Sequence, residues 1–234
     1  MYLEITPITF SVAVKPAVCL SQLRFFYGKP QEAEVSAAEL MNTMFHGSGK
    51  RDGSLTVNLE NTEIGGLPAA AFCTKPGSVD SEPIPLWTGG NKPDPCKYWR
   101  LKEADGMNRL QIEAEKFYIL RSKETISVPG SIAIYCRASD ETIGEMRIHY
   151  AGFVRPLLGR RRKDGRKGTP LIFEVRRHQV NVSLADGERM ANLTFYHMSQ
   201  DATGEGTPTG YEDQSLQLSK RTNLPSVSPR SHTY

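Results

Sequence analysis

Short apolar and β-branched runs recur along the chain, separated by Gly, Pro, Asn and Asp residues. Such runs, bounded by residues that favour turns, predict β-strands. We expect strands at residues 2–14, 53–59, 109–112, 117–120, 132–136, 147–154, 171–175, 180–184 and 190–196. Only residues 32–44 carry apolar positions near a 3.6-residue period, which predicts a helix. The pattern therefore predicts a mainly β fold with one or two short helices.

The opening of the chain resembles a later segment without a gap. Residues 2–26 lie over residues 172–196, and the identical pairs are Glu4 and Glu174, Val12 and Val182, Leu23 and Leu193, and Phe25 and Phe195. Similarity at a fixed offset is typical of tandem units. Two unrelated three-stranded meanders that share only alternation could also give these matches. The sequence leaves both interpretations open.

If the repeat is real, Met1 falls near the end of a first copy. The chain is then either a fragment of a two-unit protein or a natural remnant of one. We expect residues 1–28 to be the C-terminal end of a first unit, residues 29–200 to form a second unit, and residues 201–234 to be a flexible tail rich in Gly, Thr, Ser and Pro. The leading strands should pack against something, because an isolated hairpin leaves an apolar face uncovered.

Composition narrows the function. Charged residues make up 24% of the chain and the net charge is only +3, which does not indicate a dedicated nucleic-acid binder and leaves a small charged substrate open. The four cysteines lie far apart and form no CxxC pair, so no metal site is predicted. No run approaches the roughly 20 apolar residues of a membrane span, and no basic-then-apolar leader is visible, so we expect a soluble cytoplasmic protein.

Two segments carry a family resemblance. They are residues 117–159 (FYILRSKETISVPGSIAIYCRASDETIGEMRIHYAGFVRPLLG) and residues 169–199 (TPLIFEVRRHQVNVSLADGERMANLTFYHMS). Their ordered motifs resemble deoxycytidine triphosphate (dCTP) deaminases and their deoxyuridine triphosphatase (dUTPase) relatives, and most closely the second half of the long bacterial deaminases built of two tandem units. The resemblance covers residues 1–220. It implies a distorted dUTPase-type β-barrel and trimeric or pseudo-trimeric packing, with sites at subunit interfaces.

The resemblance also implies chemistry: hydrolysis of dCTP to dUTP without zinc, with Mg²⁺ on the triphosphate and a Glu carboxylate as general base. Glu4 and Glu174 match the family position of that Glu. Glu174 lies between Phe173 and Val175, which suits a carboxylate that lines a pocket, although a solvent-facing strand Glu would look the same. The loop partners of Glu4 would precede Met1, so a complete site around Glu4 would need another chain.

The family carries R-S-S-x-x-R in the loop that holds the triphosphate. Here Arg137 and Ser139 are retained, whereas the last Arg is replaced by Thr142, and two acidic residues intrude. The Asp that usually follows the H-Y-A-G-F motif near the sugar is Arg155. These departures predict that the second unit is a degenerate copy.

The tail resembles one that folds over bound nucleotide in the family. The resemblance transfers nucleotide-binding roles to Tyr211, Gln214 and Lys220, and such closure would exclude bulk water. An ordinary disordered terminus is the alternative.

Two further features have ordinary explanations. We interpret the basic run at residues 159–168 as a solvated hairpin loop, since no aromatic residue inside it could stack on bases, although polyphosphate or nucleic acid could bind there. We interpret His149 as a structural residue of a β-hairpin, with a catalytic acid or base as the alternative.

The sequence thus predicts a dCTP deaminase or a fragment of one. One alternative is a non-catalytic nucleotide-binding or structural subunit, motivated by Thr142 and Arg155. Another is a dUTP pyrophosphatase, which would need a water-activating Asp and a Gly-rich tail, and neither is clear here.

Overall fold

A computed structural model describes residues 7, 9–18, 20, 25, 27–75, 82–87, 93–139, 146–148, 152–160, 165–177, 181–204 and 216. Its strands are β1 (Val12–Ala13), β2 (Glu34–Val35), β3 (Phe45–His46), β4 (Ser54–Asn58), β5 (Thr62–Ile64), β6 (Leu67–Ala69), β7 (Ala71–Thr74), β8 (Ile84–Pro85), β9 (Trp99–Lys102), β10 (Arg109–Ile112), β11 (Phe117–Ile126), β12 (Ile132–Ala138), β13 (Met146–Ile148), β14 (Phe153–Val154), β15 (Thr169–Arg177), β16 (Val182–Ala185) and β17 (Arg189–His197). Its helices are α1 (Ala37–Met44) and the 3₁₀ turns η1 (Pro30–Ala33), η3 (Pro95–Lys97) and η4 (Ala202–Gly204). The predicted mainly β fold is confirmed.

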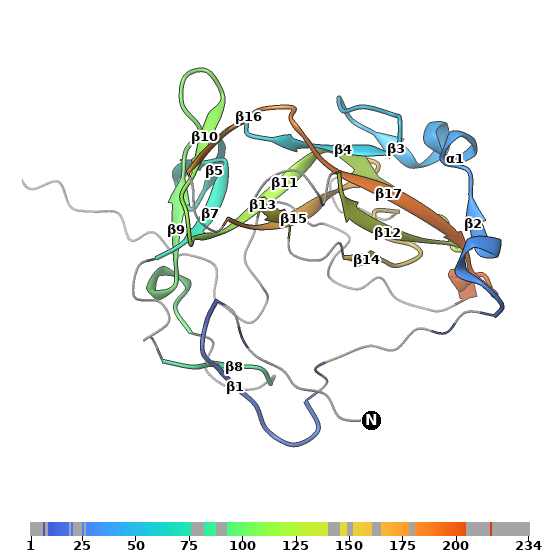
Figure 1. Cartoon of the computed structure of the whole chain (residues 1–234), viewed down its shortest axis with the longest axis horizontal. Coiled ribbons are helices and arrows are strands. Elements are labelled where there is room, and N and C mark those ends of the chain that lie inside the picture. Colours follow the sequence, from blue (N-terminus) through green and yellow to red (C-terminus); the bar gives the residue numbers. More distant parts are fainter. Residues whose placement is uncertain are drawn as a thin grey trace, which may run out of the picture.

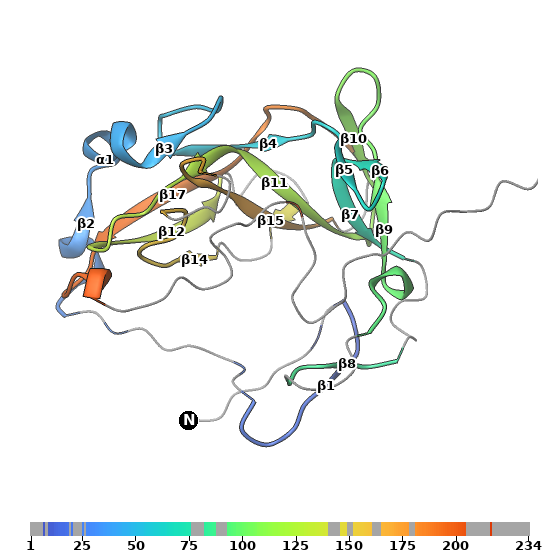
Figure 2. The same cartoon turned by 180° about the vertical axis from the view of Figure 1, so that it is seen from behind.

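One curled sheet organises the molecule (Figures 1 and 2). Its strands follow the order β13-β15-β11-β4-β17-β12-β14, and β2, β3, β7 and β9 pair with members of this path. The recorded pairs within this sheet are antiparallel. A curled antiparallel sheet can cover one apolar core with its concave side and leave polar residues outside.

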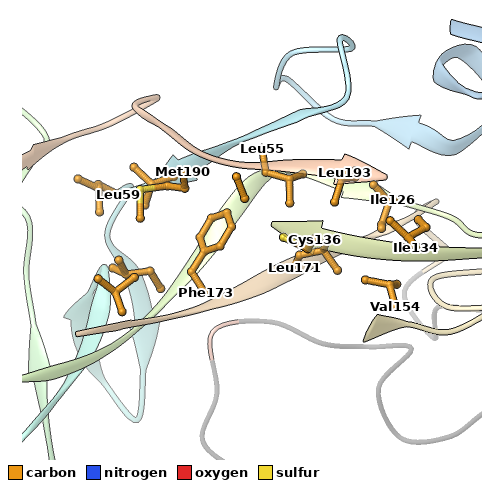
Figure 3. Close-up of a cluster of buried hydrophobic side chains, with 14 of the residues drawn as sticks. Leu55, Leu59, Ile126, Ile134, Cys136, Val154, Leu171, Phe173, Met190 and Leu193 are labelled. Atoms are coloured by element: carbon orange, nitrogen blue, oxygen red, sulfur yellow. The ribbon is translucent and has the colours of Figure 1, made fainter. Parts of the chain in front are cut away.

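The alternation of side chains decides which residues enter the core. Along β15, Leu171, Phe173 and Val175 are buried, whereas Glu174 between them is exposed. Along β12, Ile134 and Cys136 are buried. Figure 3 shows residues of both strands converging on one cluster with Leu55, Met190 and Leu193. Apolar side chains therefore fill the concave side of the sheet, and the alternating polar residues face its outer side.

The helix predicted over residues 32–44 is shorter than expected. The α-helix spans only Ala37–Met44. Pro30 begins the 3₁₀ turn η1, and β2 then pairs with Phe195 and Tyr196 of β17. Pairing with the sheet thus overrides the helical period in the first part of this segment, as tertiary contacts often override local propensity.

Two predicted strands also differ from the structure. Of the strand expected at residues 2–14, the described residues place only Val12–Ala13 in a strand. The strand expected at residues 147–154 is divided between β13 and β14, and residues 149–151, with His149, lie outside the described residues. β13 pairs with β15 and β14 pairs with β12, so the two strands lie at opposite ends of the strand order in the sheet.

The N-terminal segment packs against the rest of the chain, as expected. β1 pairs in parallel with β8, and Phe10 lies edge-on to Tyr98 and Trp99 with ring centroids 5.5 and 5.1 Å apart. Aromatic pairs in this geometry contribute about 0.5–1.5 kcal/mol beyond the area they bury. These contacts hold the segment beside β8 and β9.

The repeat itself stays a prediction. Val12 and its counterpart Val182 both lie in strands. Phe25 and its counterpart Phe195 differ, because 89% of Phe25 is exposed and only 1% of Phe195. Glu4 and Leu23 lie outside the described residues.

Gly159 closes the base of the basic loop and offers a stability test. Its φ is +70°, and an added methyl group would collide with the Ile126 carbonyl oxygen and lie 2.9 Å from the Thr169 nitrogen. We expect Gly159→Ala to lower the free energy of unfolding by about 3 kcal/mol. The left-handed backbone conformation costs a non-glycine residue about 1–2 kcal/mol, and the clash of the new methyl group with its neighbours adds the rest. Urea unfolding would measure this loss.

Gly165 is the matched control. Its φ is +73°, yet open space surrounds the position of an added methyl group. Gly165→Ala should therefore lower the free energy of unfolding only by the cost of the left-handed backbone conformation, about 1–2 kcal/mol. Equal losses in the two variants would contradict the predicted clash at Gly159.

Candidate active site

Glu174 lies on the outer side of the sheet in β15. It stands directly opposite Ile119 of β11, with Ile172 and Arg176 as its neighbours on the same face. Phe173 and Val175 point into the core, so the predicted apolar neighbours are present but face the other way. Their burial fixes the register of β15, because a slip by one residue would turn Glu174 inward.

The pKa of the Glu174 carboxyl is raised by desolvation. The side chain is nevertheless exposed to solvent. The solvent exposure shows that water reaches this carboxylate, so it could accept a proton from a water molecule.

An apolar cluster lies beside Glu174, and the same face also carries Arg121 and Arg176. Ile119, Phe72 and Leu216 form a buried cluster, and partly buried residues pack against it: Ile64, Trp99, Leu101, Phe117 and Ile172. The Arg176 guanidinium forms an ion pair with the Glu115 carboxylate at 3.4 Å. Among the described residues, none donates a recorded hydrogen bond to the Glu174 carboxylate. An apolar neighbourhood explains why burial raises the pKa of this group.

Leu216 lies beside the candidate site, and the sequence analysis did not single it out. It is 4% exposed and belongs to the cluster with Phe72 and Ile119, so the tail reaches the face that carries Glu174. Its signal is an apolar residue at the centre of a polar tail. The predicted tail residues Tyr211, Gln214 and Lys220 lie outside the described residues. They are five, two and four positions from Leu216 along the chain.

Arg137 and Ser139 lie at the end of β12. Arg137 pairs with Asn192 of β17 and is exposed, and the Ser139 amide donates to the Met190 carbonyl at 3.0 Å. The backbone of the predicted triphosphate loop is thus tied to β17 up to Ser139. Residues 140–145, with Thr142, lie outside the described residues.

One chain does not bring Arg137 and Glu174 together. Their neighbours Cys136 and Phe173 point into the same core from β12 and β15 (Figure 3). Because side chains alternate along a strand, Arg137 and Glu174 point away from that core on opposite sides. Within this chain the two side chains therefore leave the core on different sides of the curled sheet.

The two ends of the predicted hairpin loop at residues 159–168 lie next to each other in the structure. The Gly168 amide donates to the Gly159 carbonyl at 3.1 Å, so the loop leads from β14 into β15. The pKa of nearby His46 is lowered by burial and then by the charges of Lys167 and Arg51. Among the described residues no group of three His, Cys, Asp or Glu side chains could hold a metal ion.

Comparison with known proteins decides the family. Residues 50–222 match the family model of the 2'-deoxycytidine 5'-triphosphate deaminase (DCD) C-terminal domain. The chain belongs to this family. The match ends at residue 222, so it includes Leu216 and Lys220.

Solved structures agree with the family model. Among 24 matching chains is the 2'-deoxycytidine 5'-triphosphate deaminase from Agrobacterium tumefaciens, with a TM-score of 0.60 and 26% sequence identity, over 72% of this chain and 49% of that chain. The chain thus spans about half the length of this deaminase. The curled β fold with a short helix is the dCTP deaminase fold, as predicted. No curated protein matches the sequence.

The described part of the chain has no helix that is both long and apolar enough to span a membrane.

Proposed function

We propose that the chain is the C-terminal unit of a dCTP deaminase and supplies Glu174 as the general base for hydrolysis of dCTP to dUTP. The observation that carries this proposal is the Glu174 carboxyl itself. It is reached by solvent, has a raised pKa and lies beside an apolar cluster within a deaminase family domain. A base with a pKa closer to the working pH transfers protons more effectively.

In the proposed reaction, Glu174 removes a proton from a water molecule whose oxygen forms a bond to C4 of cytosine. The C4–N4 bond then breaks, and the proton leaves with the amino group as ammonia. Water and dCTP thus become dUTP and ammonia, with no oxidant or reductant. The substrate is the Mg²⁺ complex of dCTP, in which the ion neutralises triphosphate oxygens.

The complete site needs more than one copy or unit. Glu174 from one copy would act on a triphosphate held by Arg137 and Ser139 of another, because these residues lie on opposite sides of the core within a chain. A homotrimer or pseudo-trimer would supply this arrangement. Tyr211, Gln214 and Lys220 would cover the nucleotide, anchored through Leu216, which already lies against the Glu174 face. Glu4 would serve the corresponding site of a first unit.

A non-catalytic nucleotide-binding subunit is the second candidate. It is favoured by Thr142 and Arg155 at positions where the resemblance leads us to expect Arg and Asp. In addition, the Arg155 Nε is buried and has no hydrogen-bond partner among the described residues, which does not suit a residue that contacts a sugar hydroxyl.

The test is to incubate the chain with Mg²⁺ and dCTP, or with Mg²⁺ and dUTP, and to measure ammonia and pyrophosphate. Ammonia from dCTP supports the deaminase. Pyrophosphate from dUTP would instead identify a dUTP pyrophosphatase. Binding of dCTP with neither product would support the non-catalytic subunit. A Glu4→Gln variant run in parallel shows whether the N-terminal segment contributes.

The pH dependence gives a separate prediction. Glu174 can act as a base only when ionised, and its pKa is raised by desolvation. The acid limb of kcat/KM for dCTP should therefore lie above the ordinary Glu pKa of about 4.3, with activity lost as the pH falls through the raised value. An acid limb at or below the ordinary value would exclude Glu174 as the titrating base. The measurement is a pH–rate profile with a fold check by circular dichroism at each pH.

A further inference from the structure

A cavity of about 440 Å³ opens on the outer side of the sheet, where β12, β14 and β17 meet the segment that precedes η1. Five aromatic side chains line it: Phe25, Tyr27, Tyr135, Phe153 and Tyr196. Its volume lies within the range of about 300–1,000 Å³ typical of small-molecule sites. The cavity belongs to the end of the molecule that carries β2, whereas the Glu174 face packs with β7 and β9 at the other end (Figure 1).

Residues of different size on neighbouring strands create the hollow. Ala133 of β12 pairs with Tyr196 of β17, and Tyr135 pairs with Phe153 of β14. Tyr135 is edge-on to both Phe153 and Tyr196, with centroid distances of 5.6 Å. The small Ala133 therefore forms a floor between aromatic walls that are braced against each other.

The chemistry of the lining selects an uncharged, flat ligand. The described residues of the lining include no Asp, Glu, Lys or Arg, so none of them would hold a triphosphate. His197, Ser199 and the tyrosine hydroxyls supply hydrogen-bonding groups beside the rings. Phe25 and Tyr27 are each 89% exposed at the mouth, where a bound ring would cover them.

We propose that this aromatic cavity binds an uncharged nucleoside, at a site separate from the one that contains Glu174. The base lies among the aromatic rings, and the sugar hydroxyls lie toward His197 and Ser199. Stacking of a base on an aromatic side chain is worth about 1–3 kcal/mol and tolerates different bases. The site therefore takes deoxycytidine or deoxyuridine, and phosphates add nothing to the affinity.

Titration calorimetry of the full chain with deoxycytidine, deoxyuridine and inorganic tripolyphosphate tests the proposal. We expect both nucleosides to bind and tripolyphosphate to leave their affinity unchanged. Ala133→Leu, which fills the floor, and Phe25→Ala, at an exposed position, should each weaken nucleoside binding about tenfold or more. Glu103→Gln, at an exposed position outside the cavity lining, should leave it unchanged.

Two results would overturn the proposal. One is nucleoside binding that Ala133→Leu leaves unaltered, or that Glu174→Gln abolishes. The other is absence of nucleoside binding; a change in sedimentation of the Phe25→Ala variant would then identify the aromatic cavity as a protein interface. Deamination of dCTP by Ala133→Leu reports on the proposed function separately, because this variant leaves the Glu174 face intact.

Discussion

Replacing Glu174 by Gln should lower kcat for dCTP deamination by about 10²–10⁴-fold, the usual contribution of a positioned general base. The amide has nearly the size of the carboxyl, so it keeps the packing against Ile119 and Ile172. It cannot accept a proton from water. Single-turnover measurement of ammonia release would separate this chemical defect from a change in product release.

The matched control is Glu103→Gln, at an exposed position outside the Glu174 cluster. It should leave kcat unchanged. A Glu174→Gln variant that retains most of its activity would show that another group activates the water. A loss confined to KM would indicate that Glu174 contributes uniform binding and no catalysis.

Replacing Glu124 by Ala should destabilise the fold by about 3–5 kcal/mol, a large share of the 5–15 kcal/mol that stabilises a typical domain. Glu124 in β11 is 1% exposed. Its carboxylate accepts hydrogen bonds from the Lys50 amide at 2.9 Å, and from the Thr56 amide and hydroxyl at 2.7 Å each. Truncation leaves three buried or partly buried donors without this partner.

Two variants sharpen this prediction in urea unfolding. The free energy of unfolding of Glu124→Gln should lie between those of Glu124→Ala and the wild type. The Gln amide keeps one acceptor oxygen but turns an N–H donor toward a backbone N–H. Glu63→Ala, at an exposed position of β5, should stay within about 0.5 kcal/mol of wild type. A loss below 1 kcal/mol in Glu124→Ala would contradict the role of this carboxylate.

Strands with strict alternation could be predicted from the sequence. β10 matches the expected strand at residues 109–112, because Leu110 and Ile112 are buried between exposed residues. β7 was missed because all four of its residues are buried and no alternation marks it. β6 contains Pro68, which weakens any strand signal, and among the described strands it pairs with β5 alone. Short strands whose partners are distant in sequence leave little local trace.

The place of Glu174 in a strand could be predicted from the sequence, but the residues around it could not. Glu174 lies in a strand between apolar residues, as expected. That its carboxylate shares a face with Ile119 and Leu216 depends on the pairing of β11 with β15 and on the position of the tail. The aromatic cavity joins residues more than 170 positions apart, from Phe25 to Tyr196, so no local motif could indicate it.

The most direct test of the proposed deaminase is complementation between two inactive variants. Glu174→Gln and Arg137→Gln chains would be purified separately, mixed, unfolded and refolded together, and assayed for ammonia release from dCTP. If Glu174 of one copy acts on a nucleotide held by Arg137 of another, we predict that mixing restores a substantial fraction of wild-type activity, because some interfaces regain both residues. A mixture as inactive as its two components, beside an active wild-type control, would contradict a site shared between copies.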